Sequence, residues 1–252
     1  MAERDRKVFL EVCVDSVESA RAAELGGADR VELCDNLVEG GTTPSAGAIA
    51  VARENLAIKL HVIIRPRGGD FLYSATEFEV MKRDINSAKD LGADGVVIGV
   101  LLPDGTVDAE RTHELVDLAR PMSVTFHRAF DMTRDPFEAL ETLIGLDVNR
   151  ILTSGQQATA DKGVGLIERL VKRAGVRIVI MACGEIREEN VGAIIAATGV
   201  CEIHATGFVE KESEMIFRNQ SVYMGGEDLA AEYSLKVTDA GKIARLIEAA
   251  RQ

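Results

Sequence analysis

Short apolar runs alternate with amphipathic stretches along nearly the whole chain. The stretches between the runs carry apolar residues at helical spacing, as at Phe78, Met81, Ile85 and Ala88. Strands that are each followed by a helix pair in parallel through right-handed crossovers. Eight such units predict an α/β fold, a single (β/α)8 TIM barrel over residues 1–252. The predicted strands are 8–14, 30–34, 58–64, 95–101, 123–127, 150–153, 177–181 and 201–205.

Capping residues mark where several helices are expected to begin. Asp15 is predicted to cap the first helix, and Thr43-Pro44 and Asp135-Pro136 are predicted to begin two later ones. Residues 206–236 show no strong period, so we expect an irregular excursion there. The alternative fold is an open doubly wound sheet, but no G-x-G-x-x-G motif follows the first strand.

Composition and charge limit the classes of binding partner and the cellular location that we expect. The net charge of −12 argues against nucleic acid and against an anionic membrane surface. No run of eighteen apolar residues is present, so no membrane span is expected. The charged segment 1–7 resembles no secretory signal and is predicted to be flexible. We therefore expect a cytoplasmic protein whose four cysteines, none in a C-x-x-C pair, remain reduced.

Polar side chains occupy the strands and the turns that follow them, where a (β/α)8 barrel places its site. A buried charge without a partner is costly, so these groups must pair or face a wet cavity. A structural ion pair between Glu11 and Arg65 is one such arrangement. The candidates from six strands and their loops are Glu11, Cys13, Glu32, Cys34, His61, Arg65, Arg67, Asp70, Thr125, His127, Arg128, Asp131, Ser154, Gly155, Glu202 and His204.

General acid–base catalysis on a small anionic metabolite is the interpretation that the residue chemistry favours. His127 would titrate near neutral pH, and Glu32 would be a base whose pKa is raised by burial. An isomerase, lyase or hydrolase would suit these groups. The catalytic candidates are Glu11, Glu32, His127, Asp131 and His204, and the substrate-binding candidates are Arg65, Arg67, Arg128, Ser154 and Gly155.

Two further interpretations remain open. Cys13 and Cys34 end neighbouring strands, about 5 Å apart by sheet spacing, and thiolates suit Cu(I). The nearby glutamates are harder ligands, better suited to Mg²⁺ or Mn²⁺. Alternatively, the loops after the seventh and eighth strands could bind a small anion through backbone N–H groups, although Glu185 would repel phosphate.

Several motifs follow in one order along the chain, at 10–13, 27–34, 39–45, 64–71, 125–131, 152–155, 217–219 and 232–239. Together they resemble the copper homeostasis protein CutC family, most of all its animal-type members. The resemblance implies a TIM barrel, a cytoplasmic homo-oligomer (dimer or tetramer), and a role in copper binding and homeostasis. It implies Cys13 and Cys34 as Cu(I) ligands, and it favours copper handling over the enzyme hypothesis. The chain departs from the family at 183–185, where a glycine triplet is usual.

Overall fold

The eight predicted strands close into a parallel barrel in the computed structural model, which describes residues 8–222 and 231–251. Each strand pairs with the next along the chain, and β8 pairs back onto β1. The expectation of a (β/α)8 barrel is therefore confirmed, whereas segment 1–7 lies outside the described residues. The barrel strands are β1 Phe9–Val14, β2 Arg30–Leu33, β3 Lys59–Ile63, β4 Gly95–Ile98, β5 Ser123–Phe126, β6 Arg150–Thr153, β7 Val179–Ala182 and β8 Glu202–Ala205.

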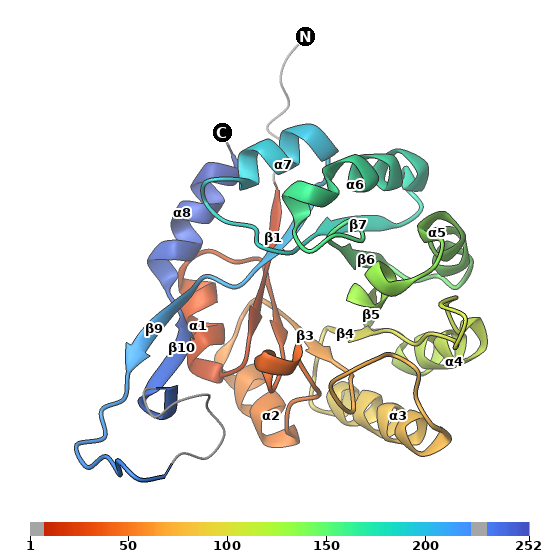
Figure 1. Ribbon diagram of the computed structural model, residues 1–252. Coiled ribbons are helices and arrows are strands. Elements are labelled where there is room, and N and C mark those ends of the chain that lie inside the picture. Colours follow the sequence, from red (N-terminus) through yellow and green to blue (C-terminus); the bar gives the residue numbers. More distant parts are fainter. Residues whose placement is uncertain (1–7, 223–230, 252) are drawn as a thin grey trace.

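Helices form a ring around the barrel (Figure 1). Among the described residues, none of these helices has both the length and the apolar character that a membrane crossing requires. Short 3₁₀ turns, η1 Leu37–Glu39 and η2 Arg128–Met132, follow β2 and β5 at the barrel mouth, and η3 Ala231–Tyr233 precedes β10. The α-helices are α1 Val17–Leu25, α2 Ala46–Asn55, α3 Ala75–Asp90, α4 Ala109–Ala119, α5 Pro136–Gly145, α6 Ala160–Ala174, α7 Val191–Thr198 and α8 Ala240–Ala250.

Two of the three predicted helix starts were wrong by one or two residues. Ser16, rather than Asp15, caps α1, because its hydroxyl accepts from the backbone N–H of Ser19. Ser45, rather than Thr43, caps α2 in the same way. In both cases a serine close to the predicted cap is better placed to accept a free N–H of the first turn. The start at Asp135 is confirmed, with Pro136 as the first helical residue.

The stretch 206–236 was predicted to be irregular, and this was wrong in part. β9 (Phe208–Glu212) pairs antiparallel with β10 (Ser234–Thr238), and Figure 1 shows this ribbon leaving the barrel beside α1 and α8. The ribbon is largely exposed on both faces, so its sequence lacks the alternation of a half-buried strand. The sequence pattern therefore gave no signal for it.

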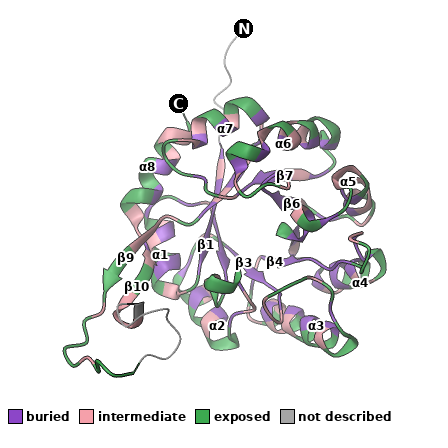
Figure 2. Cartoon of the chain, in the orientation of Figure 1, coloured by how far each residue is buried: buried purple, intermediate pink, exposed green. Residues whose placement is uncertain are grey.

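Side chains along each barrel strand alternate between the ring of helices and the barrel interior. On β1, Leu10, Val12 and Val14 pack in the core under the helices, whereas Glu11 and Cys13 point inward. Figure 2 shows the strands buried and the outer helix faces exposed. Because side chains along a strand alternate with a period of two residues, residues two positions before and after an inward-facing polar residue also face inward.

Buried ion pairs fill the barrel interior below the mouth. Arg30 donates to Glu11 and, at 2.6 Å, to Glu202. Arg150 approaches the same Glu202 oxygen at 3.0 Å and donates to Ser123 at 2.9 Å. Arg30 and Glu11 are both at most 2% exposed. These charges are balanced by one another, as burial away from water requires.

Replacing Arg30 with methionine should strongly destabilise the barrel. Glu11 and Glu202 would each lose a buried partner, and breaking a buried pair typically costs about 3–5 kcal/mol. Urea unfolding measures the loss. Arg83→Met is the matched control, because Arg83 pairs with Glu79 on the exposed surface of α3 and its removal should leave the unfolding midpoint unchanged. Equal midpoints for Arg30→Met and wild type would contradict the prediction.

Candidate functional site

A cavity of about 540 Å³ opens at the carboxyl ends of the barrel strands. Its wall combines apolar side chains, such as Leu37, Ile63 and Phe71, with polar groups from β1, β2, β8 and the loops after β3, β5 and β7. This is the end at which (β/α)8 barrels carry their sites. We call it the mouth cavity. The sequence-predicted candidates that line it are Cys13, Glu32, Arg65, His127, Arg128, Asp131 and His204.

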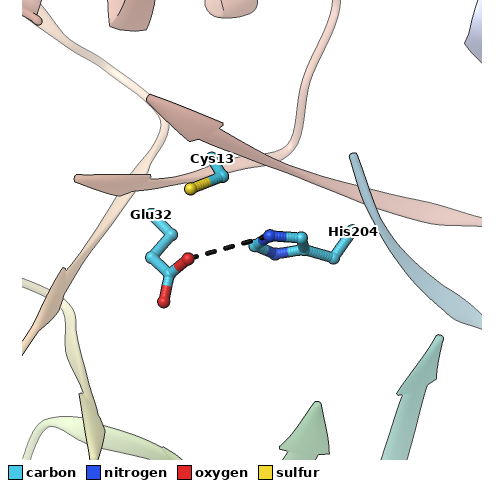
Figure 3. Close-up of side chains that lie close together, drawn as sticks. All are labelled: Cys13, Glu32 and His204. Carbon is cyan, nitrogen blue, oxygen red and sulfur yellow. Dashed lines mark ion pairs between the residues drawn. The ribbon is translucent and has the colours of Figure 1, made fainter. Parts of the chain in front are cut away.

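A thiol, a carboxyl and an imidazole meet at the inner end of the mouth cavity. Figure 3 shows Cys13, Glu32 and His204 pointing toward one another, and one ligand atom from each lies within 4.8 Å of the other two. His204 Nε2 is 3.7 Å from Glu32 Oε2. Cys34 adjoins this group, because its Sγ lies 3.5 Å from that of Cys13. The two cysteines predicted as metal ligands are therefore in contact.

The members of this cluster change one another's ionisation. The hydrogen bond from Cys34 lowers the pKa of the Cys13 thiol to about 6, against the effect of burial and with help from His204. Burial raises the pKa of Glu32 well above its usual value, and the charge on Cys13 adds to this. Burial alone would lower the pKa of His204, but its bonds to Cys13 and Glu11 outweigh burial and raise it. Cys13 is thus the group best prepared to act as a thiolate.

Glu11 lies beneath the cavity and outside its lining, fully buried. The predicted pair with Arg65 was wrong, because Glu11 Oε2 accepts from Arg30 and Oε1 is 2.8 Å from His204 Nδ1. Burial opposes ionisation, yet Arg30 and His204 outweigh it and hold the pKa of Glu11 well below its usual range. A carboxylate so engaged orients His204 and is poorly placed to react with a ligand in the mouth.

His127 directly follows β5, caps η2 and is 5% exposed. Its Nδ1 accepts a 3.1 Å hydrogen bond from the backbone N–H of Ala129, and its Nε2 is buried with no hydrogen-bond partner among the described residues. Burial, with the charge of Arg65, lowers the pKa of His127 to about 3. The expectation that this ring titrates near neutral pH is therefore contradicted, because a dry environment disfavours the imidazolium.

Two glycines, one in β4 and one directly after it, make room for the histidine rings. A Cβ on Gly99 would lie 2.3 Å from Cε1 of His127, and one on Gly95 would lie 2.4 Å from Nε2 of His61. No side chain fits at either inward position while the ring stays where it is. His61 itself is buried below the mouth, 3.8 Å from Glu11, and burial lowers its pKa to about 3.

Arg65 lines the mouth cavity but uses much of its guanidinium on the main chain. Nη1 donates at 2.7 Å to the carbonyls of Glu39 and Gly41, and Nη2 donates at 2.8 Å to that of Gly69. These bonds tie the loops after β2 and β3 together. The guanidinium also lies over the Phe71 ring, with Cζ 5.2 Å from its centroid. The positive charge of Arg65 remains at the cavity wall.

The predicted cluster after β5 is held by hydrogen bonds to the loop after β6. Asp131 accepts from Arg128 Nε at 2.9 Å and from the hydroxyl of Ser154 at 2.9 Å, and also from the N–H groups of Ser154 and Gln156. With so many donors, its carboxylate orients the loop. Ser154 and Gly155 lie behind the lining, and Gly155 approaches α6 so closely that a Cβ would lie 2.4 Å from the Gly163 carbonyl oxygen.

Arg67 is not brought to the mouth. Its Nε donates to Glu77 at the start of α3 at 2.7 Å, and its Nη2 donates to Asp70 at 3.0 Å. The guanidinium fixes the loop after β3 to that helix. Asp70, also a sequence candidate, is exposed in the same loop.

Several functional positions were missed by sequence reasoning. Arg30 and Arg150 neutralise the buried carboxylates, and Arg30 lies two positions before Glu32, so the two-residue alternation already places it inward. Phe71 and Arg187 line the mouth from loops. No periodic pattern places loop residues, so the sequence carries no comparable signal for them.

The family model for the CutC family matches residues 8–209. The human copper homeostasis protein cutC homolog is 52% identical over 238 residues, which cover 94% of this chain and 87% of the human protein.

The chain belongs to the CutC family.

Other relatives agree with this assignment. The family protein CutC of Bacteroides thetaiotaomicron is 50% identical over 97% of this chain and 98% of its own. The crystal structure of CutC from Streptococcus agalactiae matches with a TM-score of 0.76 at 35% identity, covering 79% of this chain and 98% of that one. N-(5'-phosphoribosyl)anthranilate isomerase from Pyrococcus furiosus, at 13% identity and a TM-score of 0.59 over 97% of this chain and 98% of its own, shares the fold.

The loop after β7, Cys183-Gly184-Glu185, has a backbone conformation that suits glycine at its last two positions. Gly184 has φ +94° and Glu185 has φ +56°, the left-handed region that side chains with a Cβ disfavour. Glu185 forms an ion pair with Arg187 at the rim of the mouth cavity. Glu185 therefore adds both backbone strain and a carboxylate to the rim.

Replacing Glu185 with glycine should stabilise the protein relative to Glu185→Ala. Both variants lose the pair with Arg187, but only glycine adopts φ +56° without strain, which is worth about 1 kcal/mol. Urea unfolding of the two variants measures the difference. Equal stabilities, or a more stable alanine variant, would show that the loop is unstrained at this position.

Proposed function

We propose that this CutC-family chain binds Cu(I) through the thiolates of Cys13 and Cys34, as part of copper homeostasis. The observation that carries the proposal is the contact between the two sulfur atoms, 3.5 Å apart beside the mouth cavity. Both cysteines are free. Two sulfur ligands on adjacent strands form a preformed soft site, which suits Cu(I) better than a hard cation.

The ionisation of the pair fits a metal that binds thiolates. The pKa of Cys13 is lowered to about 6. The pKa of Cys34 is raised, because Cys34 donates a hydrogen bond to Cys13 and because burial acts in the same direction. Cu(I) would replace the proton that Cys34 shares with Cys13. His204 is the third donor nearby that suits this ion. Glu32 is a hard ligand, and burial raises its pKa, which disfavours its carboxylate form.

The relatives support this assignment in their names. The human and mouse relatives are both called copper homeostasis protein cutC homologs. The proposal includes a cytoplasmic location, where free thiols remain reduced. Assembly into a homo-oligomer stays a prediction, and the site described above is formed within one chain.

The Cys13→Ser/Cys34→Ser double variant should lose tight Cu(I) binding. Titration of Cu(I) against a strong competing chelator measures the affinity. Cys201→Ser is the matched control, because Cys201 is an exposed cysteine away from the mouth and its replacement should leave the affinity unchanged. If the double variant bound Cu(I) as tightly as the wild type, this site would be ruled out.

A second candidate function is acid–base catalysis on a small anionic metabolite, of the isomerase, lyase or hydrolase type. It is favoured by the mouth cavity, which at about 540 Å³ is far larger than a metal ion and suits a small organic molecule. Glu32 and His204 lie 3.7 Å apart, and the pKa of each is raised, as suits groups that hold a proton and donate it to a bound substrate.

If Glu32 moves a proton on a bound substrate, Glu32→Gln should abolish the reaction. We expect the wild type to catalyse solvent deuterium exchange into at least one member of a panel of 2-oxo and 2-hydroxy acids, followed by NMR in D₂O. Glu188→Gln is the control, since Glu188 pairs with Arg245 on the outer surface. Exchange that persists in Glu32→Gln at the wild-type rate would remove Glu32 from the mechanism.

A further inference from the structure

The imidazole of His127 offers the mouth cavity a hydrogen-bond donor that no described protein group accepts. Because Nδ1 accepts from the backbone N–H of Ala129, the proton of the neutral ring lies on Nε2. Nε2 is buried and unpartnered in a residue that lines the cavity. Leaving such a donor unsatisfied in the folded protein is unfavourable. An acceptor supplied by a ligand would remove that cost.

The same hydrogen bond excludes other roles for the ring. To hold a metal or accept a proton at Nε2, the neutral ring would carry its proton on Nδ1. That proton would face the N–H of Ala129, so two donors would be opposed at 3.1 Å. The tautomer is therefore fixed by the main chain, and His127 is a donor to an oxygen atom.

A buried positive charge lies beside this donor. The Phe71 ring contacts both groups, since its centroid is 4.9 Å from that of His127 and 5.2 Å from Cζ of Arg65. Arg65 is 5% exposed, and among the described residues no carboxylate lies within ion-pair distance of its guanidinium. Its bonds to three loop carbonyls hold it in place without cancelling its charge.

The carboxylates on the cavity wall leave this charge uncompensated. Asp131 is paired with Arg128, and Glu185 with Arg187. Glu32 lies 3.7 Å from Nε2 of His204. The side of the cavity near Phe71 is therefore electropositive and carries an unpartnered hydrogen-bond donor.

We propose that this side of the mouth cavity binds an oxyanion group, a carboxylate or a phosphate, of a small organic molecule. The Nε2–H of His127 donates to one of its oxygens, and Arg65 supplies the positive charge. This oxyanion site adds to the second candidate function. It depends on that function only for the identity of the part of the ligand that carries the oxyanion group. Oxyanion binding requires no turnover, so a protein without detectable catalysis could still bind in this way.

Nitrogen-15 NMR of the histidine rings tests the proposal on the intact wild-type chain. The free protein should show His127 protonated on Nε2. Titration with oxalate in one arm and inorganic phosphate in the other should give, in at least one arm, a saturable shift of the His127 Nε2–H signal. The exposed ring of His113 serves as the internal reference and should not shift. A proton on Nδ1, or no saturable shift in either arm, would overturn the proposal.

Two variants separate the donor from the structural bond. His127→Asn keeps an acceptor for Ala129 but removes the Nε2 donor, so it should fold as the wild type does and bind the responsive anion at least about tenfold more weakly. His127→Gln keeps a donor near Nε2 but loses the acceptor, so it should retain more affinity than His127→Asn and less stability. Wild-type affinity in a folded His127→Asn would refute the assignment.

Discussion

The carboxylate of Glu11 is the group on which the interior of this barrel depends. It is fully buried, yet it contacts Arg30 on one oxygen and His204 on the other. Arg30 continues to Glu202, and Glu202 to Arg150, so one chain of charges joins β1, β2, β6 and β8. Without these partners a charge in this position would be prohibitively costly. The network fills the barrel interior beneath the mouth cavity and sets the orientation of His204.

Above this network the polar groups divide into two sides. Cys13, Cys34 and His204 form a side of soft donors, in contact with Glu32. His127 and Arg65 form a second group, which presents a hydrogen-bond donor and a positive charge around Phe71. The first group suits a metal ion and the second an anion. A ligand that contacts both groups would connect them.

Much of the fold could be predicted from the sequence, because strands buried on both faces and helices with one apolar face leave strong periodic signals. Alternation along β1, β2, β5 and β8 likewise identified Cys13, Glu32, His127 and His204 as inward-facing neighbours. Partner choice could not be predicted: Glu11 pairs with Arg30 instead of Arg65, because register between strands decides which charges meet. The exposed β9–β10 ribbon has no buried face and hence no pattern. The ionisation of His127 depends on how deeply the ring is buried. The sequence pattern does not give the depth of burial of a single residue at the end of a strand.

The bond that fixes the His127 tautomer comes from a main-chain N–H, which every residue except proline provides at position 129. Substitutions there and in the surrounding wall can alter the shape of the cavity without changing which ring nitrogen carries the proton. The direction of that donor is therefore a property of the backbone. As the mouth diverges among related sequences that keep this histidine and this turn, the ligands it accepts can change in size and polarity, while the requirement for an acceptor atom at this one point should persist.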